Sequence, residues 1–166
     1  ELFIDIGNIG PNYQPGHAHS DTFNFELTKD NRPFIVDKGI STYNNNYIRQ
    51  MQRSTQSHNT VKIGPKEQTQ VWGGFRVAKR AKIVSLFEKT NYIQATHDGY
   101  SRDGFNHERT FIWTNEEIII KDKISKSTGN KAIAFFHLHS SIPKPMINSK
   151  IVMIRSLGVR IEFDGA

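Results

Sequence analysis

The stretch Gly-His-Ala-His-Ser-Asp, residues 16–21, holds the densest group of chemically active side chains in this sequence. His17 and His19 are one residue apart, and Asp21 follows two positions later. Residues i and i+2 of an extended segment point to the same face, so two imidazoles with this spacing can converge on one object. A metal ion, a proton-transfer pair and two unrelated surface side chains all remain compatible with this short pattern.

Two later residues offer partners for the histidines. Asp37 ends the apolar run Phe-Ile-Val, and a carboxylate in that position is costly to bury unless it is paired or ligates something. His58 opens the segment that follows a long polar stretch. Two imidazoles and one carboxylate suit Zn²⁺ with an open coordination position, and they also suit other divalent ions. Together with His19, these residues form a candidate metal site.

The elements that must position these residues are predicted to be β-strands. Apolar and polar residues alternate in several β-branched and aromatic segments, and polar turns separate them. The expected strands include 23–27, 33–37, 76–87, 92–96, 109–113, 117–124, 132–138, 151–154 and 159–163. Many short strands of this kind predict an all-β fold, an antiparallel, jelly-roll-like β-sandwich. Residues 41–58 are the exception and predict one long loop or a short helical insertion.

Composition narrows the classes of partner. The chain has 166 residues, no cysteine and a formal net charge of +6. The absence of cysteine excludes disulfides and thiolate metal sites, and no apolar run is long enough to predict membrane insertion. A basic surface favours polyanions. Lys and Arg are scattered or placed to suit a solvated strand face, so we expect no nucleic acid, and an acidic polysaccharide and an anionic membrane surface both stay open as partners.

The length suits one domain, residues 1–166, with a core of its own. The sequence starts without methionine and stops within strand-like alternation. We therefore expect a piece of a longer chain that also has further residues at its C-terminus.

Ordered motifs in the first half carry a family resemblance. They are PGHAHSDTFNFEL, RPFIVDKGISTYN and RSTQSHNTV, and HDGY and HERTFIW follow more weakly. This series resembles the C-terminal β-sandwich domain of the heparinase II/III-like family of polysaccharide lyases. The resemblance is strongest over residues 14–76.

The resemblance implies a function and a set of site residues. Family members cleave acidic polysaccharides by β-elimination and pair a helical α/α toroid with this sandwich. On matching positions, His19, Asp37 and His58 would bind a divalent ion, with Zn²⁺ expected. The resemblance places His17 in the catalytic cleft and makes Tyr43 a proton-transfer candidate that Tyr47 could replace.

Two further residues are candidates from the same motifs, and we expect the family's helical domain to lie outside this chain. Arg53 and Asn59 suit either contact with a substrate carboxylate or bracing of the loops, and bracing is favoured for Arg53. Asp21 is a guess for a hydrogen-bond acceptor behind a ligating histidine. The helical domain supplies other catalytic residues in the family, so we expect little or no activity from this chain alone.

Three functions compete at this level. The leading one is the metal-bearing sandwich of a lyase acting on uronate-containing glycans, in a periplasmic or secreted protein. The others are a non-catalytic module that binds acidic glycans and a structural role in assembly. Trp72 is expected to lie in the core, and His97 and His107 are expected at strand ends without partners.

Overall fold

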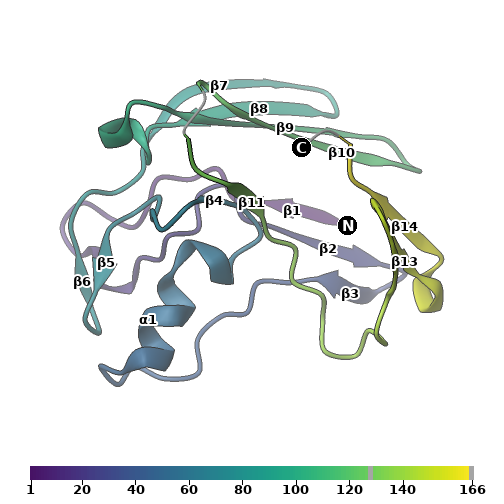
Figure 1. Ribbon diagram of the computed structural model, residues 1–166, viewed down its shortest axis with the longest axis horizontal. Coiled ribbons are helices and arrows are strands. Elements are labelled where there is room, and N and C mark those ends of the chain that lie inside the picture. Colours follow the sequence, from purple (N-terminus) through teal and green to yellow (C-terminus); the bar gives the residue numbers. More distant parts are fainter. Residues whose placement is uncertain (127–128, 165–166) are drawn as a thin grey trace.

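The chain forms an antiparallel β-sandwich, as the alternation predicts. The computed structural model describes residues 1–126 and 129–164. Figure 1 shows one sheet, β7 to β10, lying across a second sheet of β1 to β3, with the shorter strands around them. All paired strands in the described residues run antiparallel.

Two sheets make the layers of the sandwich. The larger has the order β10-β9-β8-β7 and contains β7 (Ile83–Lys89), β8 (Tyr92–His97), β9 (His107–Trp113) and β10 (Ile118–Ile124). The other has the order β1-β2-β3 and contains β1 (Leu2–Ile4), β2 (Phe25–Lys29) and β3 (Arg32–Ile35). Asp30 and Asn31 join β2 to β3 with φ of 51° and 56°. Asp and Asn tolerate this left-handed conformation, which explains the tight hairpin.

Apolar residues from both layers and from the C-terminal strands fill the space between the sheets. The main core consists of Phe25, Leu27, Phe34, Ile35, Phe111, Ile154 and Leu157. A second, smaller cluster consists of Val61, Ile63, Tyr100 and Phe105. The Phe25 and Phe111 rings meet edge to face with centroids 5.7 Å apart, so β2 and β9 are joined directly through the core.

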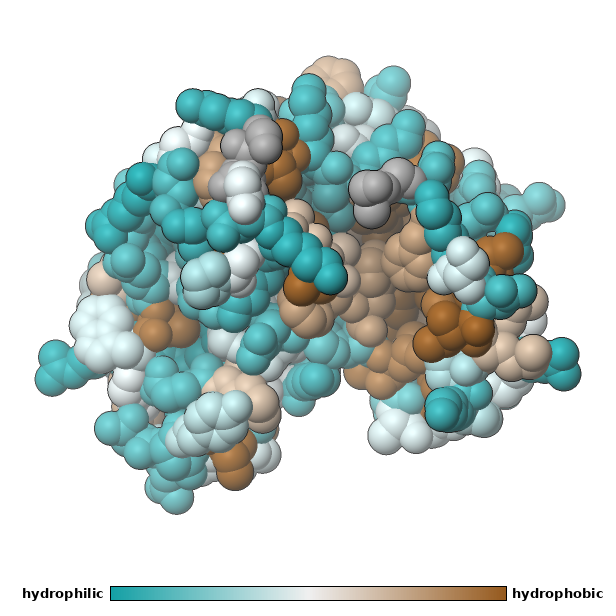
Figure 2. All heavy atoms as spheres, in the orientation of Figure 1, coloured by the Kyte–Doolittle hydropathy of each residue, from teal (hydrophilic) through white to brown (hydrophobic). Residues whose placement is uncertain are grey.

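Short strands complete the fold. They are β4 (Val61–Ile63) with β11 (Ala132–Ala134), β5 (Val71–Trp72) with β6 (Arg76–Val77), and the sheet of β12 (Met146–Asn148), β13 (Ile151–Ile154) and β14 (Val159–Glu162). Figure 2 shows hydrophobic residues lining a hollow beside this last sheet. Single-turn 3₁₀ helices lie at η1 (Pro15–His17), η2 (Thr55–Ser57), η3 (Ser101–Asp103) and η4 (Arg155–Leu157).

The predicted insertion at 41–58 contains one short α-helix, followed by the 3₁₀ turn η2. Helix α1 (Tyr47–Arg53) starts at Asn46, whose side chain accepts a hydrogen bond of 2.9 Å from the backbone N–H of Arg49. This capping satisfies one of the free donors of the first turn. Among the described residues, no helix has both the length and the apolar character needed to span a membrane.

Three strand predictions were wrong in detail. The expected strand 132–138 is a strand only over Ala132–Ala134. The expected strand 76–87 is divided into β6 and β7, because the chain between them bonds to loops: the Ala81 N–H donates to Thr69 Oγ1, and the Lys82 N–H donates to Asp98 Oδ1. Phe23 was expected to open a strand, but it lies before β2 with φ of 68° and a fully buried ring.

Candidate active site

The His-x-His segment divides its two imidazoles between two clusters. His17 closes the 3₁₀ turn η1, and only from Ala18 is the backbone extended. The two histidines therefore do not share one continuous extended segment, and their rings contact different neighbours. His17 is exposed, whereas His19 is half-buried and turns toward His58.

The inner cluster consists of His19, Asp21, Asp37 and His58. The rings of His19 and His58 have centroids 5.3 Å apart. One potential ligand atom from each of His19, Asp21 and His58 lies within 4.8 Å of the other two. Two imidazole nitrogens and one carboxylate oxygen form a donor set that suits Zn²⁺. These residues could hold a metal ion.

Asp37 contacts His58 directly. Asp37 Oδ2 lies 2.6 Å from His58 Nδ1 and also accepts a hydrogen bond of 2.8 Å from the Asn24 amide. Its other oxygen accepts from the Gly39 N–H at 2.7 Å. The opposite nitrogen of His58, Nε2, is buried without a hydrogen-bond partner. A buried polar atom left in this way calls for an explanation, and a role as a metal ligand would supply one.

The surroundings of His19 favour its neutral form. Burial, followed by the nearby positive groups His58, Arg49 and Arg53, lowers the pKa of His19 to about 4. The free ring therefore carries a lone pair at neutral pH. Burial raises the pKa of Asp21. Burial also opposes ionisation of Asp37, but the hydrogen bond and charge of His58 outweigh it and lower the pKa of Asp37. A cation in this cluster would favour both ionised carboxylates.

The outer cluster consists of His17, Tyr43 and Phe75. The His17 ring meets Tyr43 at 5.7 Å and Phe75 at 5.6 Å, edge to face in both cases. Tyr43 stacks on Phe75 at 6.0 Å and is 53% exposed. An exposed imidazole beside an exposed phenol can act in proton transfer. The structure thus brings together the two residues predicted to be catalytic.

Arg49 lies between the inner and outer clusters. Its guanidinium carbon lies 5.3 Å from the centroid of the Tyr43 ring and 5.7 Å from that of Phe75. Its Nη1 approaches His19 Nε2 at 3.4 Å, and its Nε donates to the Gly74 carbonyl at 3.2 Å. Arg49 is fully buried. The motif that begins at Arg53 does not include Arg49. The spacing of four residues, which places both arginines on the same side of a helix, was the one sequence signal for it.

Arg53 and Asn59 are both fully buried and bonded to backbone. Arg53 donates to the carbonyls of Ala18, Gly73, Gly74 and Arg76 at 3.0–3.2 Å. Ala18 lies between His17 and His19, so the hydrogen bonds from Arg53 to its carbonyl hold the backbone between the two histidines in place. The Asn59 amide donates to the carbonyls of Phe25 and Val36. This geometry supports bracing for both, and neither side chain offers a free group to a substrate.

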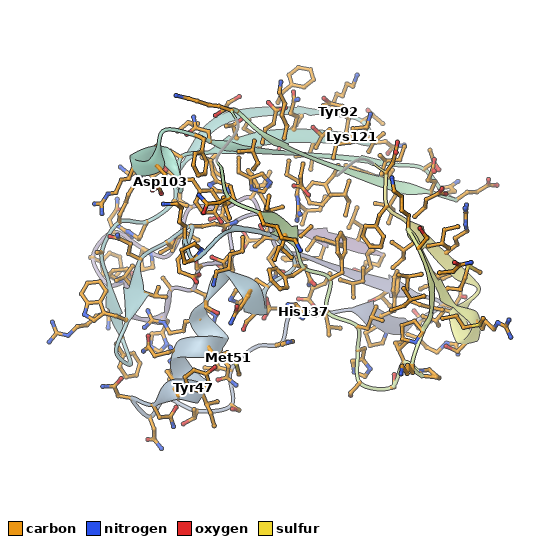
Figure 3. All side chains as sticks on the ribbon, viewed as in Figure 1. Tyr47, Met51, Tyr92, Asp103, Lys121 and His137 are labelled. Carbon is orange, nitrogen blue, oxygen red and sulfur yellow. The ribbon has the colours of Figure 1, made fainter. Side chains whose placement is uncertain are left out.

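Two aromatic residues lie elsewhere than predicted. Trp72 was expected in the core, but it is 46% exposed on the two-residue strand β5. Tyr47, the substitute for Tyr43, is 77% exposed and lies with Met51 on the outer side of α1 (Figure 3). In the described contacts, Tyr47 has no ring contact with His17.

Two pockets flank His17. One, of about 620 Å³, is open and is lined by η1, the residues before it and the β5–β6 hairpin. The other, of about 240 Å³, is lined by residues 5–11 of the N-terminal segment and by His17, His19 and Asp21. Because both pockets share the His17 side chain, a ligand in either one can reach it.

Sequence reasoning missed a buried histidine network behind the site, formed by His97, His107, Arg109 and Asp122. His97 Nε2 lies 3.0 Å from His107 Nδ1, and His107 Nε2 lies 2.7 Å from Asp122 Oδ1. Arg109 forms two bonds with Asp122 at 2.7 and 2.9 Å. The prediction that the two histidines lack partners was wrong. Their place in register across β8 and β9 brings them together.

Comparisons with known proteins agree with this architecture. The chain is similar in fold to a heparan sulfate lyase HepC mutant from Pedobacter heparinus, with a TM-score of 0.66 and 18% identity. The match covers 91% of this chain and 23% of that one, so this chain spans about a quarter of the length of that lyase. No curated protein matches the sequence. The family described as Heparinase II/III-like, C-terminal, matches residues 1–164. The chain therefore belongs to the heparinase II/III-like, C-terminal family.

Proposed function

We propose that this chain is the metal-bearing sandwich of a polysaccharide lyase that cleaves acidic, uronate-containing glycans by β-elimination. The observation that carries the proposal is the position of two exposed proton-transfer groups, His17 and Tyr43, beside a buried cluster of histidines and carboxylates. Family membership supports this chemistry, and the name of the similar structure points to glycosaminoglycans as the substrate class.

The elimination requires two proton movements. A base removes the proton from the ring carbon that bears the uronate carboxylate. The electron pair left there forms a double bond to the neighbouring carbon, whose bond to the bridging oxygen breaks. The leaving oxygen takes up a proton. His17 and Tyr43, with ring centroids 5.7 Å apart, can act on the same sugar, and a positioned acid or base of this kind typically contributes about 10²–10⁴-fold.

The proposed ion, with Zn²⁺ expected, would bind at the inner cluster through His19, His58 and a carboxylate. When bound, it supplies charge neutralisation and links segments far apart in the sequence. The orphaned Nε2 of His58 supports Asp21 as the carboxylate ligand, with Asp37 orienting the ring through Nδ1. Coordination through Nδ1 instead would make Asp37 the ligand, as the family motif implies.

Metal analysis of two isosteric variants separates these ligand sets. Asp21→Asn and Asp37→Asn each remove one carboxylate charge and keep the shape of the side chain. The direct ligand should lose more than about 100-fold in metal affinity, whereas an orienting residue should lose about 10–100-fold. The variant with the larger loss identifies the ligand, and full metal content in both would contradict a site at this cluster.

We also propose that the chain acts together with a helical domain and has little or no activity alone. The length of the similar lyase supports a larger protein. In the described residues, the sandwich offers His17 and Tyr43 but encloses neither of them on all sides, as their exposure shows. An acidic polysaccharide substrate also supports a periplasmic or secreted location.

The test is the ultraviolet absorbance of the unsaturated uronate product, measured with the protein that carries this chain on heparan, chondroitin and alginate substrates. His17→Ala should abolish the rise in absorbance while the metal content stays complete. Phe87→Ala, on β7, is the matched control and should keep both. Absence of product from the unmodified protein on every uronate polymer would contradict the lyase.

Two observations favour a second function. The open pocket beside His17 and the net charge of +6 also suit a module that binds acidic glycans without cleaving them. Retained binding without product formation would favour this function over the lyase.

A further inference from the structure

The pocket of about 620 Å³ beside His17 has lining residues that the catalytic proposal does not use, among them Tyr13, Trp72 and Arg76. Its walls are the loop before η1 and the β5–β6 hairpin. Three aromatic side chains lie at this pocket and remain exposed: Tyr13 at 88%, Trp72 at 46% and Phe75 at 49%. Single exposed aromatic rings scattered over a surface are normal, but several that gather at one hollow indicate a binding site.

A cation lies beside the largest of these rings. Trp72 pairs with Arg76 across the β5–β6 hairpin, so both side chains project from the same face. In the described part of the chain, the Arg76 guanidinium forms no ion pair. An aromatic face next to a free guanidinium can receive a flat ring that carries a carboxylate or a sulfate.

The backbone brings this pocket close to the outer cluster. A Cβ atom added at Gly16 would lie 3.4 Å from the Phe75 carbonyl oxygen and 3.5 Å from its Cβ, which is ordinary van der Waals contact, so η1 packs directly against the hairpin at Phe75. The donors of Arg53 hold the same hairpin through the carbonyls of Gly73, Gly74 and Arg76. The pocket is therefore a braced site with His17 on its rim.

We propose that this pocket is a subsite for one anionic pyranose ring of the glycan, next to the ring on which His17 acts. Trp72 stacks on the sugar, and Arg76 pairs with its carboxylate or sulfate. The inference rests on the proposed function for the identity of the polymer, but its binding partners, Trp72 and Arg76, differ from the proposed proton-transfer residues.

Tryptophan fluorescence can test the subsite in the chain itself. The sequence has two tryptophans, so Trp113→Phe leaves Trp72 as the sole reporter. Heparin-type oligosaccharides should change its emission in a saturable way, and dextran of equal size should not. Calorimetry should then show about tenfold weaker binding for Trp72→Ala, which corresponds to about 1.4 kcal/mol. Trp72→Phe should recover part of this loss.

The charge of Arg76 has a separate readout. Arg76→Gln should weaken oligosaccharide binding severalfold and reduce its dependence on salt, because one screened charge pair is removed. Phe87→Ala, on the upper sheet, should bind as the parent chain does. Unchanged Trp72 emission at saturating oligosaccharide, or equal affinity for dextran, would overturn the subsite.

The outcomes distinguish this inference from the lyase. Oligosaccharide binding at Trp72 by a protein that forms no unsaturated product would keep the subsite and remove the lyase. Product formation with an unchanged KM in Trp72→Ala would keep the lyase and remove the subsite.

Discussion

Two groups of histidine and aspartate lie in this sandwich, and they differ in how completely their polar atoms are used. In the buried histidine network, both ring nitrogens of His97 and of His107 have partners. In the inner cluster, His58 is equally buried but its Nε2 has none. The same residue types therefore have a structural role in the buried histidine network, whereas in the inner cluster a ring nitrogen stays free to coordinate an ion.

The proton positions of the buried histidine network follow from its neighbours. The Gly99 N–H donates to His97 Nδ1, so that nitrogen carries no proton and Nε2 donates to His107. His107 then donates from Nε2 to Asp122. This chain uses neutral rings, in keeping with the lowered pKa values of both histidines, which result chiefly from burial.

The two groups are physically connected. Arg109 donates from Nη1 to the Asn59 carbonyl at 2.7 Å and to the Phe23 carbonyl at 3.0 Å. Asn59 follows His58, and Phe23 lies two residues after Asp21. The Phe23 ring packs against His97 and His107 at 4.9 and 5.3 Å. The buried histidine network, whose polar atoms are hydrogen-bonded, thus holds in place the backbone that carries the inner cluster.

The strongest way to break this comparison is to remove the cation of the buried histidine network. Arg109→Met leaves Asp122 without its bidentate partner and two carbonyls without donors, so we expect unfolding free energy to fall by about 3–5 kcal/mol. Urea denaturation measures this loss. The control Arg160→Met breaks an exposed pair with Glu162 and should change the free energy by about 1 kcal/mol or less. Equal losses in the two variants would contradict a structural role for the network.

Metal removal should lower the free energy of unfolding through the inner cluster alone. An ion present at about 100 times its dissociation constant stabilises the folded state by about 2.7 kcal/mol, and chelation should remove that contribution. His58→Ala should lose the ion and its chelator response. His139→Ala is a matched control, since its ring bonds only to Ser141 in the described contacts and it should retain the metal. A chelator response that survives in His58→Ala would place the ion elsewhere.

Acid should weaken the buried histidine network. The pKa values of His97 and His107 are lowered in the folded state, so below about pH 6.5 the unfolded chain binds more protons than the folded one. Stability is therefore fully present above that pH and falls as the pH decreases, by up to about 1.4 kcal/mol per pH unit for each histidine. The lowered pKa of Asp122 acts in the same direction at more acidic pH.

Urea denaturation between pH 7.5 and 5, with a chelator throughout, measures this slope. His97→Gln should reduce it, because one of the two titrating rings is gone. A slope that is unchanged in this variant would show that the loss of stability arises at other groups.

The sequence was more informative about the fold and about the members of the inner and outer clusters than about the buried histidine network. Alternation was sufficient for the sandwich because one buried face per strand leaves a period of two. The motif positions made His19 and His58 candidate ligands of one ion, and His17 and Tyr43 candidate proton-transfer residues. The structure places the rings of the first pair 5.3 Å apart and those of the second pair 5.7 Å apart, and the roles themselves stay predictions.

The remainder depends on tertiary register, which local pattern does not contain. His97 meets His107 because β8 and β9 pair with these residues opposite each other, and Arg109 lies opposite Asp122 across β9 and β10. A turn shifted by one residue would place either pair on different faces. Trp72 was misjudged for a similar reason, because a two-residue strand is too short to show which face is buried.

The smallest expected change in stability comes from removing one phenol oxygen. Tyr43→Phe keeps the ring that stacks on Phe75 and lies beside Arg49. Among the described hydrogen bonds, none involves the Tyr43 hydroxyl, so unfolding free energy should change by less than about 0.5 kcal/mol. Turnover by the protein that carries this chain should nevertheless fall by about 10²–10⁴-fold if the phenol transfers a proton.

Tyr100 provides the matched control for this variant. Its buried hydroxyl donates to the Val61 carbonyl at 2.7 Å, so Tyr100→Phe should cost about 0.5–1.5 kcal/mol and leave turnover per folded molecule unchanged. A Tyr43→Phe variant that keeps full turnover would remove the phenol from the mechanism. Neither the Tyr43 hydroxyl nor the Tyr100 hydroxyl would then take part in turnover. The proton-transfer partner of His17 would have to come from outside this sandwich.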